Sequence, residues 1–588
     1  MSAFHGPMPA PTPLSLSPQP TEPLQDHGPT ETLREERFFL ILSVFLGVFA
    51  GLAVVTLRIV IDWSKLIFLG PDPANSPLRL VIAPTIVGLA VAVLVIHVFP
   101  TARGSGVTQT KSALYILNGY ISIRTTIGKF VLSALAIGSG QSLGPEDPSL
   151  QVGAGLASSL GRRLHLSRNK LRLIAPVGAA AGLAAAFNAP ISAVLFVIEE
   201  VVGRWSAGVL GAVVLSSISS VVVMRWFLGA APMFRIPATQ LVSPRELLAY
   251  AVLGIVGGLV AVLFAKAIGA LRPRLRALPQ WTQYFLPSTA GLLVGLMGSL
   301  GAYQVMGAGY ESIDQAMHDQ FTWKVLTVLV VLKMVATTLS FSSGTPGGMF
   351  APTLFIGAML GGVVGAVEHW IFPSLTGSTA TYVLVGMGVL FAGFLRVPMT
   401  SVFMVLEVSG NYSVIVPVIV ANTLAYVISR ELQPTAIFDI LTRQDGLDLP
   451  SMEERRDERS LHIEDAMQLP PSIILDSDNS LNDALTQVQG AHEETFLVRL
   501  SPSGWNLITR GDLQTRVGEG KGDMTLNSIL PARRAPYLHP DQDLDTALRW
   551  VNEWAIVPVV SRADFRRLEG VLSQQDVLAR YETWDVDR

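Results

Sequence analysis

The 588-residue sequence contains no cysteine and few charged residues. The absence of cysteine excludes disulfides, cysteine-based metal sites and a thiol nucleophile. Charged residues make up 15% of the chain, whereas an average soluble protein has about 25%. The nine histidines are scattered without the spacing of metal ligands, so we expect no metal site. A formal net charge of −3 gives no whole-chain basis for nucleic-acid binding.

The few charges are unevenly distributed. Residues 441–588 hold 16 basic and 26 acidic residues, whereas residues 1–440 hold 26 basic and 19 acidic ones. The first part is therefore about 10% charged and the second about 28%. This contrast predicts a membrane domain at 37–440, a charged linker at 441–460 and a soluble domain at 461–588. Residues 1–36, of which eight are proline, are expected to be a disordered tail.

Long apolar segments predict membrane-spanning helices, which need about 20 apolar residues each. Five segments qualify: Phe38–Leu57, Leu78–Phe99, Ala207–Leu228, Leu248–Ile268 and Trp323–Leu339. Two further apolar segments, Ile191–Ile198 and Met399–Leu406, are too short to span a bilayer. Each follows a proline and ends at a glutamate. Interrupted segments of this kind indicate broken helices that meet near the membrane midplane.

The membrane part contains an internal repeat. Residues 148–161 resemble 352–365, residues 190–199 resemble 398–407, and Gly-Ser-Gly at 104–106 has a counterpart in Gly-Ala-Gly at 307–309. Three matches in order, at offsets of 203 to 208, predict two homologous halves at about 38–235 and 245–440. A site at their interface is expected. Similarity alone leaves open whether the repeat is inverted or parallel.

Glycine and proline precede three of the interrupted helices, at residues 104–106, 144–148 and 344–352. A helix that starts there has free N–H groups and a partial positive charge at its N-terminus. Several such ends that converge can bind an anion. Glu146 lies at one of them, and a carboxylate in a membrane domain is costly unless it has a function. We expect it to occupy the anion's place when charged and to leave when protonated; the alternative is a simple helix cap, for which Asp147 is better suited.

Other charged residues have alternative explanations. Glu407 is the repeat counterpart of Glu199, which favours a structural role for Glu199 and leaves Glu200 as the functional candidate. Lys129 and Lys333 lie in or beside apolar segments and could raise the local positive potential, although extension to the membrane surface is the simpler expectation. The segment 161–172 carries five basic residues and is expected to be cytoplasmic.

The motifs resemble those of the CLC family of chloride channels and chloride/proton exchangers. Residues 104–108 resemble the family's GSGIP motif, 144–148 its GxEGP motif and 348–352 its GxFxP motif, and the closest stretch is 179–200. The resemblance covers about 38–440. It implies an all-α polytopic membrane domain of two inverted repeats with broken helices, a homodimer with one pore per subunit, and cytoplasmic termini.

The resemblance also implies roles for particular residues. The Ser105 hydroxyl and the backbone N–H groups of Met349 and Phe350 would bind the central anion. Glu146 would be the external gate and proton acceptor, and Glu200 the inner proton relay. The sequence departs from the family pattern at three positions: Thr108 replaces proline, Asp147 replaces glycine, and Phe438 replaces tyrosine. Phe438 keeps the ring but lacks the hydroxyl, so we expect anion binding to persist with altered affinity. This departure leaves open how tightly the movements of protons and anions are coupled.

The C-terminal region, 461–588, alternates short strands and helices in two similar units. It resembles a tandem CBS pair, an α+β domain often attached to such transporters. By that resemblance, Thr509, Asp512, Ser573 and Asp576 would contact a nucleotide. The alternative is that the pair binds nothing and serves in dimer packing. An adenine nucleotide bound to this pair is the one possible cofactor, and we expect transport itself to require no cofactor.

These features predict antiport of chloride against protons, for which Glu146 and Glu200 are the main argument. The alternative is a passive voltage- or pH-gated chloride channel of the same fold, which the missing hydroxyl at Phe438 favours. A divalent-cation channel would need more acidic residues in the apolar segments, and no Ser/His pairing supports an enzyme. The expected partners are chloride, protons, the lipid bilayer and a second copy of the chain. The expected location is a bacterial inner (plasma) membrane.

Overall fold

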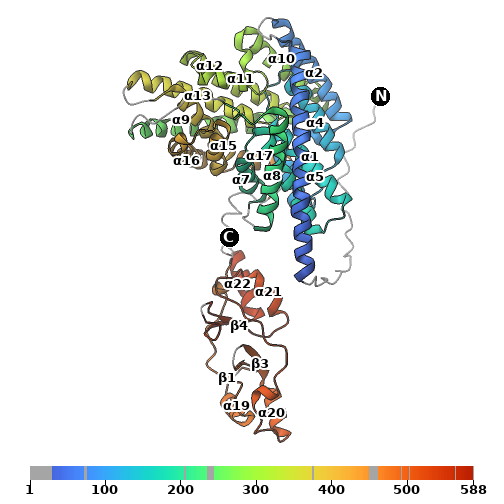
Figure 1. Cartoon of the computed structure of the whole chain (residues 1–588), viewed down its shortest axis with the longest axis vertical. Coiled ribbons are helices and arrows are strands. Elements are labelled where there is room, and N and C mark those ends of the chain that lie inside the picture. Colours follow the sequence, from blue (N-terminus) through green and yellow to red (C-terminus); the bar gives the residue numbers. More distant parts are fainter. Residues whose placement is uncertain are drawn as a thin grey trace. The chain divides into compact units, whose positions relative to one another are not determined.

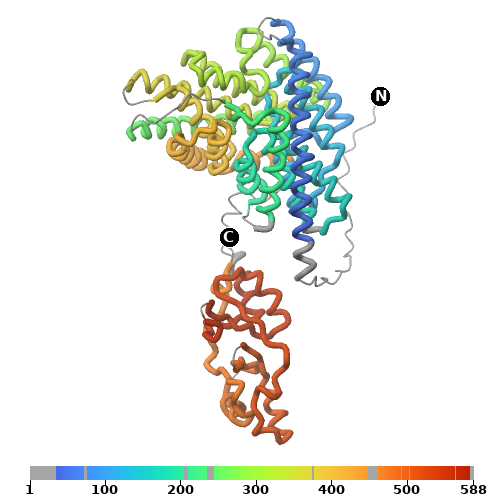
Figure 2. The backbone as a smooth tube through the Cα atoms, viewed as in Figure 1, coloured from blue at the N-terminus to red at the C-terminus, as the bar shows by residue number. Residues whose placement is uncertain are grey.

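The computed structural model describes residues 29–71, 76–203, 207–234, 244–373, 377–447, 449, 461–491, 493–501, 504–562 and 564–586. The chain divides into two compact units, Met1–Arg455 and Arg456–Arg588 (Figures 1 and 2). Residues 1–28 of the predicted tail and most of the predicted linker, 451–460, lie outside the described residues. The last part of the predicted tail is helical, because the first helix begins at Pro29.

In the described residues of the first unit, the regular elements are helices. Those of the first half are α1 (Pro29–Leu69), α2 (Pro77–His97), α3 (Gly106–Tyr115), α4 (Ile123–Gly138), α5 (Glu146–Arg163), α6 (Arg168–Phe187), α7 (Pro190–Phe196) and α8 (Ala207–Leu228), with the short turns η2 (Pro100–Ala102) and η3 (Val197–Val202). Figure 1 shows α1 as a long helix that runs beside α5 and α8. The predicted span 207–228 matches α8 at both ends, whereas α1 is much longer than the apolar run within it.

The second half repeats this arrangement. Its helices are α9 (Glu246–Arg276), α10 (Leu286–Met297), α11 (Tyr310–Met317), α12 (Trp323–Ser342), α13 (Phe350–Ile371), α14 (Thr379–Leu395), α15 (Pro398–Ser409), α16 (Ile415–Leu432) and α17 (Ile437–Gln444), with the short turns η4 (Gln280–Tyr284), η5 (Gly298–Ala302), η6 (Tyr303–Val305) and η7 (Tyr412–Val414). Among the described residues, nine helical segments are long and apolar enough to cross a membrane. Five were predicted; the others carry more glycine, alanine or interruptions and so lack a plain apolar run.

Equivalent helix pairs in the two halves pack through equivalent glycines. A Cβ atom on Gly153 of α5 would lie 2.2 Å from the backbone oxygen of Gly178 in α6. A Cβ atom on Gly357 of α13 would lie 2.2 Å from the backbone oxygen of Gly386 in α14. Only glycine permits backbones to approach this closely. The α5–α6 and α13–α14 pairs are therefore built in the same way, as the sequence repeat predicts.

The contacts between the halves show that the repeat is inverted. Gly144 and Gly348, which are repeat counterparts, form an antiparallel bridge with N–H to carbonyl distances of 2.8 and 2.9 Å. The carboxylate of Glu199, beyond the C-terminal end of α7, caps the N-terminus of α15 through the N–H groups of Met399 and Thr400. Helices α7 and α15 therefore lie antiparallel, with the end of one against the start of the other.

The reciprocal contact completes the two-fold relation. The carboxylate of Glu407, in the last turn of α15, accepts hydrogen bonds from the N–H groups of Ile191 (3.0 Å) and Ser192 (2.8 Å) at the start of α7. Equivalent membrane helices that run in opposite directions are related by an axis in the membrane plane. The contacts also confirm the predicted structural role of Glu199, since each glutamate satisfies N–H groups that the helix itself cannot.

The second unit is an α+β domain of two similar halves. Its elements are η8 (Ile463–Asp465), β1 (Ile474–Asp476), α19 (Leu481–Val488), β2 (Thr495–Arg499), β3 (Trp505–Thr509), α20 (Arg510–Gly518), η9 (Leu526–Ser528), α21 (Asp545–Val551), β4 (Val557–Val560), β5 (Leu568–Leu572) and α22 (Gln574–Val586). In the first half β2 lies between parallel β1 and antiparallel β3. In the second half β4 pairs antiparallel with β5, and Val559 also bridges Leu538 in parallel. The first half thus has the order strand, helix, strand, strand, helix, and the second half has helix, strand, strand, helix with the isolated bridge at Leu538 before it.

Candidate functional site

Three helix N-termini converge in the first unit, as the glycine and proline pattern predicts. Helix α5 begins at Glu146, and the Glu146 carboxylate accepts a hydrogen bond from the N–H of Ala351 in the first turn of α13 (3.3 Å). The next residue, Asp147, accepts one from the N–H of Gly106, the first residue of α3 (2.7 Å). Two adjacent carboxylates therefore each lie at the N-terminus of a different broken helix, where backbone N–H groups favour negative charge.

Glu146 is completely buried, yet only part of its carboxylate is bonded. Oε2 contacts the Ala351 N–H, whereas Oε1 has no hydrogen-bond partner within the described part of the chain. Gly144 makes room for this side chain, since a Cβ atom there would lie 2.3 Å from Oε2. A buried carboxylate oxygen without a partner is costly and is typical of functional groups. The geometry fits a carboxylate that another anion can replace at the same position.

Ser105 contacts a carboxylate of the chain itself. It is the N-cap residue of α3, and its hydroxyl donates a hydrogen bond to Oδ1 of Asp147 at 2.6 Å. The side chain of Asp147 also accepts from the N–H of Val107 (3.2 Å) and lies 3.8 Å from Nζ of Lys129. The donor that the resemblance assigned to a transported anion is thus used by a carboxylate of the chain itself, because Asp147 stands where the family has glycine.

The remaining predicted anion ligands lie around an aromatic cluster. Met349 is the N-cap of α13 and Phe350 its first residue, so their N–H groups belong to those that a helix cannot satisfy internally. The Phe350 ring lies 5.1 Å from that of Phe196 and 6.2 Å from that of Phe438, centre to centre. Phe438 lies in the first turn of α17 and is buried. Met349, Phe350 and Phe438 are therefore brought together, and the N–H of Ala351, which the sequence analysis missed, lies beside them.

Glu200 forms a buried ion pair that the sequence analysis missed. It lies on η3, a π-helical turn, and accepts a hydrogen bond from Nζ of Lys111 at 2.8 Å. The same ammonium contacts Asp439 of α17 at 3.0 Å. The side chains of Lys111 and Glu200 are fully buried, and that of Asp439 is 8% exposed. A counter-charge for Glu200 could have been expected on physical grounds, but its position 89 residues away could not.

Lys129 and Lys333 do not extend to the membrane surface, so that expectation is wrong. Both are fully buried. Nζ of Lys129 donates to the carbonyl of Gly104 (2.5 Å), and Nζ of Lys333 donates to that of Gly307 (2.8 Å). Gly104 and Gly307 are repeat counterparts, and so are the two lysines. Each lysine satisfies a carbonyl in the turn before a broken helix, α3 or α11, and adds positive charge there.

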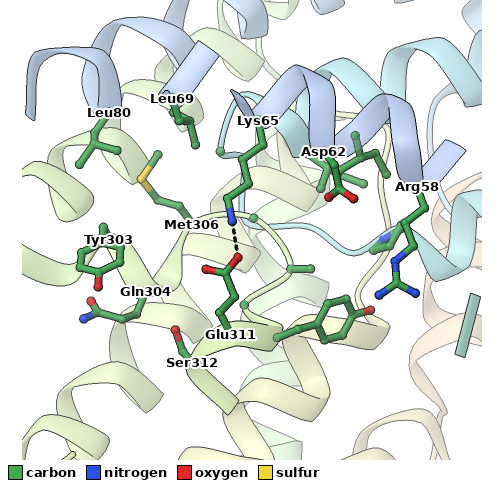
Figure 3. A pocket seen from close by; sticks show the side chains of 18 residues that line it. Arg58, Asp62, Lys65, Leu69, Leu80, Tyr303, Gln304, Met306, Glu311 and Ser312 are labelled. Atoms are coloured by element: carbon green, nitrogen blue, oxygen red, sulfur yellow. Dashed lines mark hydrogen bonds and ion pairs between the residues drawn. The ribbon is translucent and has the colours of Figure 1, made fainter. Parts of the chain in front are cut away.

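A cavity of about 310 Å³ adjoins this site. It is lined by Pro145, next to Glu146, and by charged residues of α1 and α11 (Figure 3). Figure 3 shows Arg58, Asp62 and Lys65 along α1, with Lys65 paired to Glu311 at 2.6 Å. The charged lining therefore contains both signs, with Arg58 and Lys65 as bases and Asp62 and Glu311 as acids.

The cavity and the basic segment 161–172 lie at opposite ends of α1. Nζ of Lys170 lies 4.9 Å from the ring centre of Phe39, near the start of α1. Arg58 follows Phe39 by 19 residues, or about 28 Å along a helix that rises about 1.5 Å per residue. That distance is close to the thickness of a bilayer's hydrocarbon core, about 30 Å. The cavity therefore belongs to the membrane face opposite the basic segment.

In the second unit, the four predicted nucleotide-contacting residues form two helix caps. The Thr509 hydroxyl donates to Asp512 (2.6 Å) and accepts from the Asp512 N–H at the start of α20. Ser573 and Asp576 form the same pair at the start of α22. This is a common capping arrangement. The Thr/Ser–x–x–Asp pattern is thus explained locally, and the equivalent pairs confirm that the two halves of the domain are similar.

The geometry defines a class of protein: a polytopic membrane protein of two inverted repeats, with broken-helix N-termini that converge on an anion-compatible site. The family model described as "voltage gated chloride channel" matches residues 87–430. The chain therefore belongs to the CLC family of membrane chloride-transport proteins.

Individual relatives and structures agree with this assignment. The chain is 31% identical to the "H(+)/Cl(-) exchange transporter ClcA" of Vibrio campbellii over 420 residues, 68% of this chain and 88% of the relative. It is 31% identical over 379 residues to a ClcB-like protein of Ralstonia nicotianae, covering 63% and 87% of the two chains. The solved structure of a slow cyanobacterial Cl⁻/H⁺ antiporter matches 69% of this chain and 97% of its own (TM-score 0.65, 24% identity).

A eukaryotic CLC transporter structure matches 93% of this chain and 98% of its own, with a TM-score of 0.61 and 20% identity. A match over that share of the chain extends into the second unit. At these identities the two structures establish a shared fold only.

Proposed function

We propose that the protein is a secondary antiporter that exchanges chloride for protons, with Glu146 as its mobile gate. The observation that carries this proposal is the half-bonded, fully buried Glu146 carboxylate at the N-terminus of α13. A charged carboxylate there competes with chloride for the same N–H groups and the same partial positive charge. Protonation removes the charge and with it the attraction. Entry of chloride and protonation of Glu146 are therefore linked, and such a link is a requirement for coupled transport.

Glu200 is the proposed inner proton relay. It is buried near the aromatic cluster, since it lies four residues after Phe196. Its ion pair with Lys111 holds the carboxylate in place. Asp439 contacts the same ammonium, so Lys111 has two carboxylate partners. The triad can accept and release one proton without exposing an unpaired buried charge.

The cavity beside Pro145 is the proposed outer entry for the anion. If segment 161–172 is cytoplasmic, as its five basic residues indicate, the cavity opens to the outside and Glu146 stands between it and the α13 N-terminus. In this arrangement Glu146 controls the passage of the anion from the outer cavity to the α13 N-terminus.

Purified full-length protein in chloride-loaded vesicles tests the antiport. An outward chloride gradient is imposed in weak buffer, and external pH and chloride are recorded together. Proton uptake that accompanies chloride efflux, against the proton gradient, supports exchange. Glu146→Gln should abolish proton uptake and retain chloride flux, and Glu200→Gln should reduce proton uptake. Asp314→Asn, at an exposed carboxylate of the same unit, is the matched control and should leave both fluxes unchanged.

A passive chloride channel is the second candidate, and Phe438 favours it. The ring packs against Phe350 and Phe196 but supplies no hydroxyl donor to an anion. Weaker anion binding loosens the link between chloride and the Glu146 carboxylate. Chloride flux without any pH response in the vesicle experiment would support the channel and contradict the role of Glu200.

The assembly is proposed to be a homodimer in a bacterial inner membrane with both termini in the cytoplasm. The family relation and the basic segment support this arrangement. The chain has no native cysteine, so a single introduced cysteine reports its side directly. Ser167→Cys should react with a membrane-impermeant maleimide only after the cells are opened, and reaction in intact cells would contradict the orientation.

The second unit is proposed to be a CBS pair that binds an adenine nucleotide. Its two similar halves support this, as do the equivalent caps formed by Thr509 with Asp512 and Ser573 with Asp576. Calorimetric titration of the full chain with ATP and AMP tests it, with Asp512→Asn as the variant. Heat of binding that is lost in the variant supports a ligand site; no heat with either nucleotide leaves packing as the role of this unit.

A further inference from the structure

The side chain of Asp147 is held like a bound anion. Its two oxygens accept hydrogen bonds from the Ser105 hydroxyl (2.6 Å) and from the N–H groups of Gly106 (2.7 Å) and Val107 (3.2 Å). Nζ of Lys129 lies 3.8 Å away, and Asp147 is only 2% exposed. Hydroxyl, paired N–H groups at a helix N-terminus and a nearby cation form a complete anion cradle.

This contact is not an ordinary cap of the helix that carries Asp147. The residue belongs to the first turn of α5, but all its hydrogen-bond donors come from the start of α3, about 40 residues earlier. Asp147 also contacts the turn before α13, because a Cβ atom on Gly348 would lie 2.6 Å from its Cβ. The carboxylate therefore lies between the α3 N-terminus and the segment that leads into α13.

The inverted repeat shows that the fold does not require a carboxylate at this position. The counterpart of Asp147 in the second half is Ala351, and the counterpart of Ser105 is Ala308. Helix α11 still begins after its glycine turn, and Lys333 still donates to the carbonyl of Gly307. The buried lysine and the turn are thus common to both halves, whereas the hydroxyl and the carboxylate occur together only in the first half.

We propose that Asp147 is a resident anion of the transport pathway: it fills the anion position at the α3 N-terminus and takes the Ser105 hydroxyl. Chloride is then held by the N–H groups at the start of α13. Ser105 is a positioning residue for Asp147 rather than a chloride ligand, and Lys129 balances the resident charge. The inference rests on the proposed function in that it assumes that anions pass between α3 and α13.

Bromide provides a direct test, because its anomalous scattering marks anion positions in crystals of the full chain. In the wild-type protein we expect bromide near the α13 N-terminus and none within hydrogen-bond distance of the Ser105 Oγ. In Asp147→Gly, which restores the family's residue, a bromide should replace the lost carboxylate at Ser105. Bromide bound to Ser105 in the wild-type protein would overturn the proposal, and this arm needs no variant to fold.

Calorimetric titration with chloride, on the full chain in detergent, distinguishes the effect of the space that the Asp147 side chain fills from the effect of its charge. In the wild-type background, Ser105→Ala should change the chloride Kd by less than about twofold. In the Asp147→Gly background, where the hydroxyl is free to bind chloride, the same substitution should raise the Kd by about tenfold. Asp147→Asn removes the charge but keeps the side chain in place, so it should not make chloride binding sensitive to Ser105. Equal sensitivity to Ser105→Ala in all three backgrounds would overturn the proposal.

These outcomes are independent of proton coupling. If the vesicles show chloride flux without proton movement and bromide still avoids Ser105, the exchange mechanism fails and the resident anion stands. If exchange is observed but bromide binds to Ser105, the exchange mechanism stands and the proposal of a resident anion fails.

Discussion

Lys111 should contribute strongly to the stability of the first unit. Its ammonium lies 2.8 Å from Glu200 and 3.0 Å from Asp439, in surroundings that leave Lys111 and Glu200 fully buried. At an effective dielectric constant near 20, each contact is worth about 6 kcal/mol of Coulomb attraction before desolvation is subtracted. Lys111→Met leaves two buried carboxylates without their cation. Breaking a buried pair in this way typically costs about 3–5 kcal/mol.

The assay is thermal unfolding of the purified protein in detergent, followed by tryptophan fluorescence and by size-exclusion chromatography. For a unit of 455 residues, a loss of that size should lower the midpoint by roughly 3–5 °C. Lys111→Arg keeps the positive charge and should lower the unfolding midpoint by less than Lys111→Met does. A triple variant, Lys111→Met with Glu200→Gln and Asp439→Asn, should recover most of the loss, because neutralising a whole buried ion cluster is often close to neutral. A single Lys111→Met variant as stable as the wild type would refute the reasoning.

Three further predictions follow from local contacts. Glu407→Ala should cost about 1–3 kcal/mol in thermal unfolding, because it leaves the first N–H groups of α7, including that of Ser192, unsatisfied; unchanged stability would argue against the reciprocal caps. Gly153→Ala should abolish a stable fold in the same assay, since the new Cβ would lie 2.2 Å from a backbone oxygen, whereas Gly211→Ala in α8, with its nearest neighbour at 3.4 Å, should be tolerated. Thr509→Ala should cost about 1 kcal/mol of local stability and speed hydrogen exchange in α20 several-fold, and unaltered exchange there would contradict the cap.

Much of the helix arrangement could be predicted because the signals are local. The apolar run 207–228 is helix α8 at both ends, and the short apolar segments that begin at Thr495 and Trp505 are strands β2 and β3. The convergence of three helix starts followed from glycine and proline positions and from the repeat. The long helix α1 was underestimated, because its helix continues from the apolar run into charged residues at both ends.

The partners of the site residues could not be predicted, because they are distant in the chain. Lys111 contacts Asp439 across 328 residues, and the Ser105 hydroxyl donates to Asp147 across 42. The resemblance placed Ser105 against the anion because the family's GxEGP motif has glycine at the position of Asp147. Lys129 was expected at the membrane surface, but its burial is stabilised by the carbonyl of Gly104 and by the charge of Asp147. In each case tertiary packing supplies the partner that local sequence does not contain.

The reversal potential of reconstituted protein tests the central claim most directly. With a fixed chloride gradient, the voltage at which no net chloride moves is measured while the pH gradient is varied. For coupled exchange the reversal potential must shift steadily with the pH gradient, and in Glu146→Gln it must stay at the chloride equilibrium value. A wild-type reversal potential that equals the chloride equilibrium value at every pH gradient would contradict the account and identify the protein as a passive chloride conductor.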